Sequence, residues 1–302
     1  MSRGQASGPN AIGTAQLLVV LLAFCWGMVW IATAFALPEI KPWTLRTVCI
    51  GIGAATLFVV ARLAGFDLNV PRRERIHVMV GGFFNLAAFH VLTAFAQLNG
   101  ATSRTIVITY SMPIWATLLS VVMLHERLGR ARIVAFSLCV AGLGVLIWPL
   151  LANGVPVFAL YSLTAAVSWA FAIVYMKWMR VTVPPLANAA WQLLFAFVVL
   201  SVGTLTFEGV PRLWPLSTPA LVAVLYIGVL GVGLAHFLFW SIVGRLSTVA
   251  AALGMLLVPV VGIISSTLLL GERPTVPDIV GFALIFMAAA SVLLWPAVTP
   301  TK

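Results

Sequence analysis

The sequence predicts an all-α polytopic membrane protein with ten transmembrane helices, arranged as two five-helix inverted repeats. Three observations support this prediction: the chain has few charges, its apolar runs have the length of membrane-spanning helices, and its two halves match. Of the 302 residues, 62% are hydrophobic and only 8% are charged, whereas a soluble domain carries about 25% charged residues. So few charges cannot cover a water-exposed surface, which excludes a soluble enzyme, a secreted domain and a disordered protein.

The apolar runs are long and continuous. Between Arg3 and Glu39 lie 35 residues without a formal charge, and between Arg132 and Lys177 lie 44. A membrane-spanning helix needs about 20 apolar residues, so the longer interval holds two helices and a turn. Barrel strands would alternate apolar and polar residues, and these runs do not. Separated by Pro, Gly or charged residues, the predicted helices cover 15–37, 42–63, 76–97, 103–124, 131–149, 156–178, 184–206, 218–241, 246–270 and 276–296.

These runs divide the chain without leaving room for a soluble domain. The predicted parts are a tail at 1–14, a first repeat at 15–149, a linker at 150–155, a second repeat at 156–296 and a tail at 297–302. Ala34-Phe35-Ala36 resembles a signal-peptidase site. The apolar segment before it exceeds the usual signal core of about 7–15 residues, so we interpret it as a helix.

The distribution of Lys and Arg predicts the orientation, because cytoplasmic loops are enriched in these residues. One side holds twelve of them: Arg3, Arg62, Arg72, Arg73, Arg75, Arg127, Arg130, Arg132, Lys177, Arg180, Arg245 and Lys302. The other side holds four: Lys41, Arg104, Arg212 and Arg273. Both termini are therefore expected in the cytoplasm. The net charge of +10 is then a topology signal, and no nucleic-acid partner is expected.

The two halves match at an offset of 146 residues or close to it. The matched pairs are Pro38 with Pro184, His90 with His236, Pro113 with Pro259, and Glu126-Arg127 with Glu272-Arg273. Trp26 matches Trp169 at an offset of 143 residues. Each half holds five predicted helices, an odd number, so the second half enters the membrane from the opposite side. Inverted repeats of this kind are typical of secondary transporters.

Several of these motifs together resemble a known family. They are a Trp late in the first helix of each half, Pro-x7-Arg from Pro38 to Arg46, the prolines at 113 and 259, and the paired Glu-Arg motifs. Over about 15–296, the chain resembles the drug/metabolite transporter superfamily, in particular its EamA-like two-domain exporters of the YddG type. The resemblance implies a ten-helix transporter of the bacterial inner membrane, which exports small metabolites by alternating access through a central cavity. Gln192, where the second half would repeat Arg46, departs from this pattern.

Polar and aromatic residues deep in the predicted helices are candidates to contact a substrate, since polar groups avoid lipid. His90, Thr93 and Gln97 share one helical face at i, i+3 and i+7, and His236 and Trp240 lie one turn apart. An aromatic face can attract an ammonium group. The aromatic candidates are Trp26, Tyr110, Trp115, Trp169 and Trp240. The alternative is that the histidines bond neighbouring carbonyls and that the tryptophans only pack the bundle.

Other residues are candidates for hinges and gates. Pro113 and Pro259 each remove a helix hydrogen bond and allow a kink. Glu126 and Glu272 lie at helix ends, where capping, pairing with arginines and gating are the alternatives. Arg46 is the one formal charge clearly inside a predicted helix, since the others lie close to helix ends. We expect it to extend to the outer interface, although contact with a substrate carboxylate is the alternative.

The substrate class stays open at this point. The aromatic residues favour amino acids, including neutral and aromatic ones, over drugs, organic cations or other metabolites. No Asp or Glu lies in the middle of a predicted helix, so either His90 and His236 couple protons, or the protein is a uniporter or an exchanger. No cofactor or metal site is expected, because the three cysteines form no CxxC pair.

An enzyme would need a motif such as His-Glu-x-x-His, which the sequence lacks. A channel gains no advantage from an inverted repeat. The expected partners are a small-molecule substrate and the lipid bilayer, and a monomer is compatible with the sequence.

Overall fold

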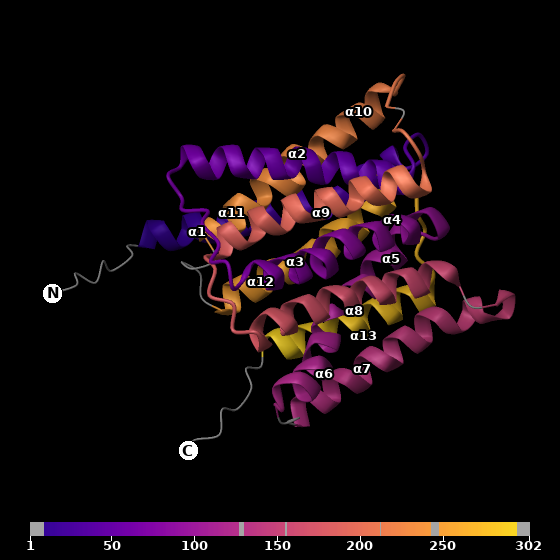
Figure 1. Ribbon diagram of the computed structural model, residues 1–302. Coiled ribbons are helices and arrows are strands. Elements are labelled where there is room, and N and C mark those ends of the chain that lie inside the picture. Colours follow the sequence, from indigo (N-terminus) through magenta and orange to yellow (C-terminus); the bar gives the residue numbers. More distant parts are fainter. Residues whose placement is uncertain (1–8, 127–129, 155, 212, 243–247, 295–302) are drawn as a thin grey trace, which may run out of the picture.

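The structure is a computed structural model that describes residues 9–126, 130–154, 156–211, 213–242 and 248–294. Within these ranges every regular element is helical, which confirms the predicted all-α class. The helices run roughly along one common direction, and both ends of the chain lie on the same side of the bundle (Figure 1).

Among the described residues, the first half contains seven α-helices and two shorter segments of different winding. In chain order they are α1 (Pro9–Ala36), α2 (Pro42–Leu63), α3 (Arg75–Gly82), the π-helix η1 (Phe83–Ala88), α4 (Phe89–Asn99), α5 (Thr102–Thr109), α6 (Met112–Leu124), α7 (Arg130–Ile147) and the 3-10 helix η2 (Trp148–Asn153). The run α3–η1–α4 is helical without interruption. The α5–α6 run breaks at Tyr110 and Ser111.

The second half repeats this order with fewer breaks. Its elements are α8 (Val157–Trp178), α9 (Pro185–Phe207), α10 (Thr218–Leu225), the π-helix η3 (Tyr226–Leu234), α11 (Ala235–Ile242), α12 (Thr248–Leu269) and α13 (Val276–Leu294). Among the described residues, eight helical segments are long and apolar enough to cross a membrane. Two further apolar stretches, Leu256–Leu269 and Val276–Ser291, are shorter.

Proline begins several of these helices. Pro42, Pro113 and Pro185 lie in the first turns of α2, α6 and α9, where the missing N–H group costs nothing. Helices α2, α5 and α9 carry no acidic residue in the first turn. The free N–H groups at these ends therefore need acceptors from elsewhere in the chain.

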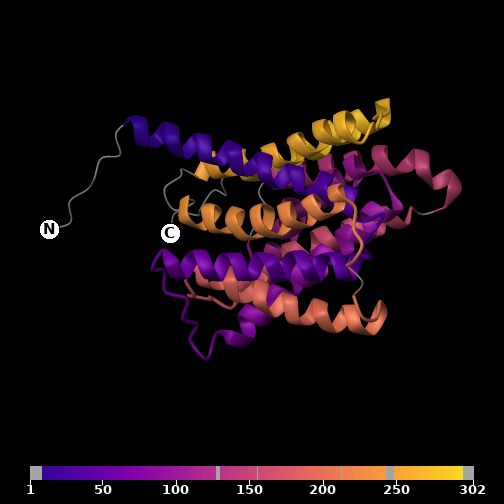
Figure 2. The same cartoon turned by 90° about the horizontal axis from the view of Figure 1, so that it is seen from above.

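Helices of the two halves are interleaved. Helix α1 of the first half packs against α12 of the second half, and α8 of the second half packs against α4 and α6 of the first half (Figures 1 and 2). Helix α2 lies against both α9 and η3, and α7 pairs with α13. Contacts between the halves thus run through the whole bundle.

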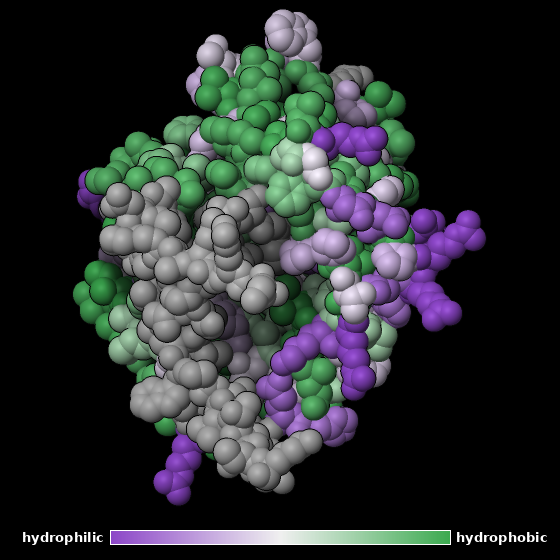
Figure 3. All heavy atoms as spheres, turned by 90° about the vertical axis from the view of Figure 1, so that its left-hand side faces the viewer, coloured by the Kyte–Doolittle hydropathy of each residue, from purple (hydrophilic) through white to green (hydrophobic). Residues whose placement is uncertain are grey.

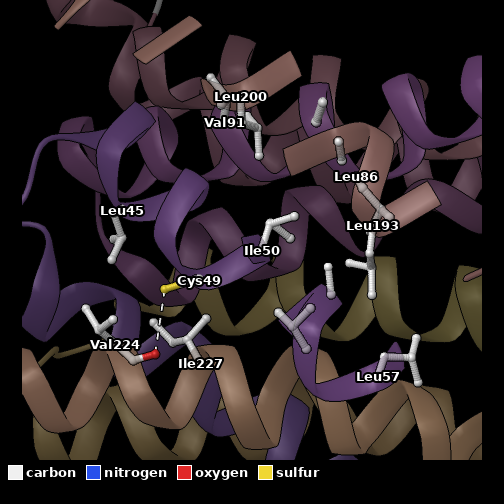
Figure 4. Packing of buried hydrophobic residues seen from close by; sticks show 14 of the residues in the cluster. Leu45, Cys49, Ile50, Leu57, Leu86, Val91, Leu193, Leu200, Val224 and Ile227 are labelled. Atoms are coloured by element: carbon white, nitrogen blue, oxygen red, sulfur yellow. Dashed lines mark hydrogen bonds between the residues drawn. The ribbon is translucent and has the colours of Figure 1, made fainter. Parts of the chain in front are cut away.

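The largest apolar core is shared by the two halves. Leu45, Ile50 and Leu57 of α2 lie among side chains of α9 and of the α10–η3 run, such as Leu193 and Ile227 (Figure 4). Glycines bring the backbones close together where α2 meets η3. A Cβ atom added to Gly53 would lie 2.2 Å from Val232 Cγ1, and one added to Gly228 would lie 2.7 Å from Ile52. Small residues are how membrane helices approach each other closely.

The outer surface is apolar. Leu63, Val122 and Leu268 are 83%, 72% and 75% exposed. Hydrophobic residues cover the flanks in Figure 3, whereas hydrophilic residues gather on the end face toward which both termini lead. Soluble proteins rarely expose large continuous apolar surfaces, so lipid is the medium that suits these flanks.

Candidate substrate pathway

The predicted polar face of α4 points into the bundle. Thr93 is 2% exposed, and its hydroxyl donates to the His90 carbonyl at 3.0 Å. One turn further, Gln97 Nε2 donates to the Trp30 carbonyl of α1 at 2.9 Å. Gln97 therefore meets α1, and Thr93 is enclosed within the bundle. Trp30, which our sequence reasoning missed, also lies close to Tyr110, with the ring centroids 6.4 Å apart.

The expectation that Arg46 extends to the interface is wrong. Its side chain is only 3% exposed and turns into the bundle, where Nε donates to the His90 carbonyl at 2.8 Å. The guanidinium also contacts the hydroxyls of Thr33 at 3.3 Å and Thr93 at 3.5 Å. These oxygens replace water around the charge, so the side chain need not reach the surface. Arg46 thereby joins α1, α2 and α4.

The second polar group involves both halves. Trp26 of α1 donates from Nε1 to the Gly231 carbonyl of η3 at 3.0 Å. Its ring meets His236 edge-on at 5.8 Å and Phe239 at 5.3 Å. His236 Nδ1 is bonded to the Val232 carbonyl at 2.7 Å. The bond to a neighbouring carbonyl, which was the alternative to substrate contact, is therefore present at His236.

Both predicted histidines follow a π-helix. Segment η1 ends at Ala88 and η3 ends at Leu234, so each stops two residues before its histidine. π-Helical turns are rare and are frequent at functional sites. The matched positions in sequence are therefore matched in local winding as well.

A third group of predicted residues surrounds an apolar cavity of about 110 Å³. Tyr110, Pro113, Trp169 and Pro259 all line it. Its other walls come from α5, α6, α12 and α13: Val107, Met112, Leu256, Ile263, Phe282, Ile285, Phe286 and Ala289. The structure thus brings the two predicted hinge prolines to one place.

The remaining predictions have different outcomes. Pro113 coincides with the break between α5 and α6, whereas Pro259 lies inside the continuous helix α12. Trp115 does not line the cavity, and its Nε1 donates at 3.0 Å to Oγ of Ser111, the residue just before α6. The side chain of Trp240 lies outside the described residues.

The glutamates at helix ends connect the two halves. Glu272 accepts from the backbone N–H groups of Thr102 at 2.5 Å and Ser103 at 2.9 Å, which caps α5 from 170 residues away. Glu126 pairs with Lys177 Nζ at 2.8 Å. Capping, one of the alternatives that the sequence had left open, is therefore present at Glu272, and the helix it caps belongs to the other half.

Three further glutamates have the same role and were missed by our sequence reasoning. Glu208 accepts from Trp43 N at 2.9 Å and Thr44 N at 2.8 Å at the start of α2. Glu74 binds the chain just before α9, and Glu39 binds Ser217 before α10. Every one of these contacts crosses between the halves. The signal in the sequence was the absence of an acid in the first turns of α2, α5 and α9.

Hydrogen bonding shifts the titration of two of these caps. Bonds from the side chain and backbone of Ser217 lower the pKa of Glu39 below its ordinary value of 4.5. Bonds from Thr182, and a further one from Val183 N, lower the pKa of Glu74 in the same way. Donors that favour the ionised carboxylate have this effect, so both caps are charged at neutral pH.

Known proteins resemble this chain over nearly its whole length. The sequence model of the EamA-like transporter family matches twice, at residues 13–148 and 157–294. The chain is 25% identical to the "uncharacterized transporter YoaV" of Bacillus subtilis, over 89% of this chain and 93% of that one. It is 24% identical to a "probable amino-acid metabolite efflux pump" of Salmonella typhimurium, over 89% and 91%. A similarly named protein of Escherichia coli is 25% identical, over 90% and 91%.

One solved structure, described only as a protein crystal structure, superposes with a TM-score of 0.65. The match covers 95% of this chain and 100% of the chain of the solved structure, at 23% sequence identity, and it therefore supports the fold alone. The family match spans both halves and agrees with the motifs from which the resemblance was first drawn. This chain therefore belongs to the EamA-like transporter family, and it is a membrane transporter and not an enzyme.

Proposed function

We propose that the protein is a secondary transporter that exports small metabolites, foremost neutral and aromatic amino acids, across the bacterial inner membrane. The observation that carries this proposal is the meeting of polar and aromatic groups from both halves inside the bundle. The Trp26 ring meets His236 with the centroids 5.8 Å apart, and Trp26 Nε1 donates to the Gly231 carbonyl at 3.0 Å. Relatives named as amino-acid metabolite efflux pumps support the same substrate class.

We infer further that all ten apolar runs cross the membrane, as two inverted repeats with cytoplasmic termini. Three kinds of observation support this. The family model matches each half separately. The packing is reciprocal: α2 against η3 has its counterpart in α9 against η1, and α1 against α12 in α8 against α6. Each half also carries its π-helix before the matched histidine. Two such units can rock about a shared centre.

In this proposal the substrate passes Trp26, His90, Thr93, Gln97 and Tyr110, with Trp169 and His236 from the second half. The apolar cavity at Tyr110 and Trp169 suits an aromatic or aliphatic side chain. Pro113 and Pro259, on its wall, are the hinges. No carboxylate of the described helices lies at their centre, so export does not depend on a carboxylate-bound ion.

Transport by purified protein in liposomes tests the proposal. We expect saturable flux of labelled phenylalanine without an imposed ion gradient. His90→Ala and Trp26→Ala should each lower that flux about tenfold or more, because each removes a side chain from the pathway. Trp148→Ala is the matched control, since this tryptophan is 76% exposed on the outside. Undiminished flux in both interior variants would remove them from the pathway. Flux of organic cations but of no amino acid would contradict the proposed substrate class.

A further inference from the structure

Arg46 is a buried cation without a carboxylate partner. In the described part of the chain, only two charged residues are buried, Arg46 and Asp278. Asp278 is paired with Arg104 through two bonds, at 2.6 and 2.8 Å. A buried charge that lacks a counterion is costly, and such residues in membrane proteins mark functional sites.

The chain has no spare anion for Arg46. It contains seven acidic residues, and each one is bonded to other groups. Their partners are Ser217 for Glu39, Asn69 for Asp67, Thr182 for Glu74, Lys177 for Glu126, Trp43 and Thr44 for Glu208, Thr102 and Ser103 for Glu272, and Arg104 for Asp278. The counterion of Arg46 must therefore come from another molecule.

The hydrogen bonds of Arg46 leave capacity for such an anion. A guanidinium has five N–H donors, and the three contacts are to a carbonyl and two hydroxyls. Only the bond from Nε is short, at 2.8 Å, whereas those to Thr33 and Thr93 are 3.3 and 3.5 Å. Charge-assisted bonds to a carboxylate are about 2.7–2.9 Å long. Neutral oxygens therefore hold the guanidinium in place without neutralising it.

An unused acceptor lies nearby on the same face of α4. Gln97 Oε1 is buried and has no hydrogen-bond partner. The orientation of this amide is fixed, because Nε2 must face the Trp30 carbonyl, to which it donates at 2.9 Å. Gln97 follows Thr93 by one helical turn, which places their side chains about 5–6 Å apart. An orphan acceptor thus lies one turn from a hydroxyl that contacts Arg46.

We propose that Arg46 provides the countercharge for the substrate's α-carboxylate and that the Gln97 carbonyl accepts from its ammonium group. This proposal rests on the proposed function and narrows its substrate class to α-amino acid zwitterions. An organic cation without a carboxylate would bring a second positive charge to Arg46 and is rejected. Trp30, whose carbonyl accepts from Gln97, and Tyr110, whose ring lies 6.4 Å from that of Trp30, offer aromatic surface to the rest of the substrate. Since Arg46 is 3% exposed here, the site fills when the halves move apart.

A ligand series tests charge recognition on the unaltered protein. We would measure the affinity of purified protein for phenylalanine, phenylalaninamide and phenethylamine by ligand-dependent thermal stabilisation. Phenylalaninamide lacks the carboxylate charge, and phenethylamine lacks the carboxyl group entirely. We expect phenylalanine to bind about tenfold or more tightly than either analogue, the scale expected for loss of one charge pair.

Two variants assign that preference to Arg46. In Arg46→Gln, the residue found at the matched position 192, the preference for phenylalanine over its amide should disappear, while Arg46→Lys should retain part of it. Equal weakening of all three ligands would show that Arg46 only supports the fold, and would overturn the inference. Equal affinity of the unaltered protein for the acid and the amide would also overturn it, with the proposed function intact. Absence of phenylalanine binding and transport altogether would instead contradict the proposed function.

Discussion

Two regions hold the halves together. One consists of apolar contacts, and the other consists of polar contacts. In the middle, α2 meets η3 through glycines, with Gly53 against Val232 and Gly228 against Ile52. At the helix ends, glutamates of one half bind backbone N–H groups of the other, as Glu272 binds Thr102 and Ser103. The first region is apolar and depends on close fit. The second is polar, and water can replace its bonds.

This difference assigns the regions to different parts of a transport cycle. Close apolar packing loses about a quarter to a half of its dispersion energy when a gap of about 0.5–1 Å opens, so the α2–η3 contact is suited to remain closed while the halves move. Hydrogen bonds at a water-exposed helix end are exchanged for bonds to water at small net cost. The glutamate caps are therefore suited to open. Each of the following predictions tests one side of this comparison.

The largest effect is expected in the middle. Gly53→Ala adds a Cβ atom 2.2 Å from Val232 Cγ1 and 3.2 Å from the Gly228 carbonyl. Val232 is 2% exposed and has no free space to move into, so we expect a loss of about 1–3 kcal/mol of stability. The measurement is the melting temperature in detergent. Gly144→Ala is the matched control, because no atom lies within 4 Å of its added Cβ, and it should be neutral or stabilising. Equal melting of both variants would contradict the close-fit description.

A smaller effect is expected at a single cap. Glu272→Gln removes the negative charge of the carboxylate that accepts hydrogen bonds from the backbone N–H groups of Thr102 and Ser103 at the start of α5. Loss of a cap costs about 0.5–2 kcal/mol, again measured as a shift in melting temperature. Asp67→Asn is the control, because Asp67 bonds only to Asn69, two residues away on the surface, and should leave the melting temperature unchanged. If both variants melt alike, Glu272 does not connect the halves.

The smallest effect should appear on acidification. Glu39 and Glu74 have lowered pKa values in the folded protein, so their stabilising effect is complete above the ordinary value of 4.5 and is lost as the pH falls through the folded pKa. We expect the melting temperature to fall below about pH 4.5. The double variant Glu39→Gln, Glu74→Gln should show a shallower fall over the same range. Parallel curves for the variant and the parent would exclude these two caps as the titrating groups.

The sequence by itself determined the helices and much of the polar face. Apolar length and proline positions located the helical runs, because a bilayer demands about 20 apolar residues per crossing. The spacing of His90, Thr93 and Gln97 placed them on one face, which in the structure meets α1 and α2. The matched motifs of the two halves also pointed to the family that the comparison then showed.

Tertiary structure alone decided where Arg46 points and which helices the glutamates cap. Distance from a helix end is visible in the sequence, but whether a long side chain turns outward depends on acceptors from other helices, here the His90 carbonyl and Thr33. The cap on α5 comes from a residue 170 positions away. The π-helices were also hidden, since one wider turn barely changes an apolar pattern. Local periodicity records which side of a helix avoids water, whereas partners distant in the chain are fixed only when the bundle packs.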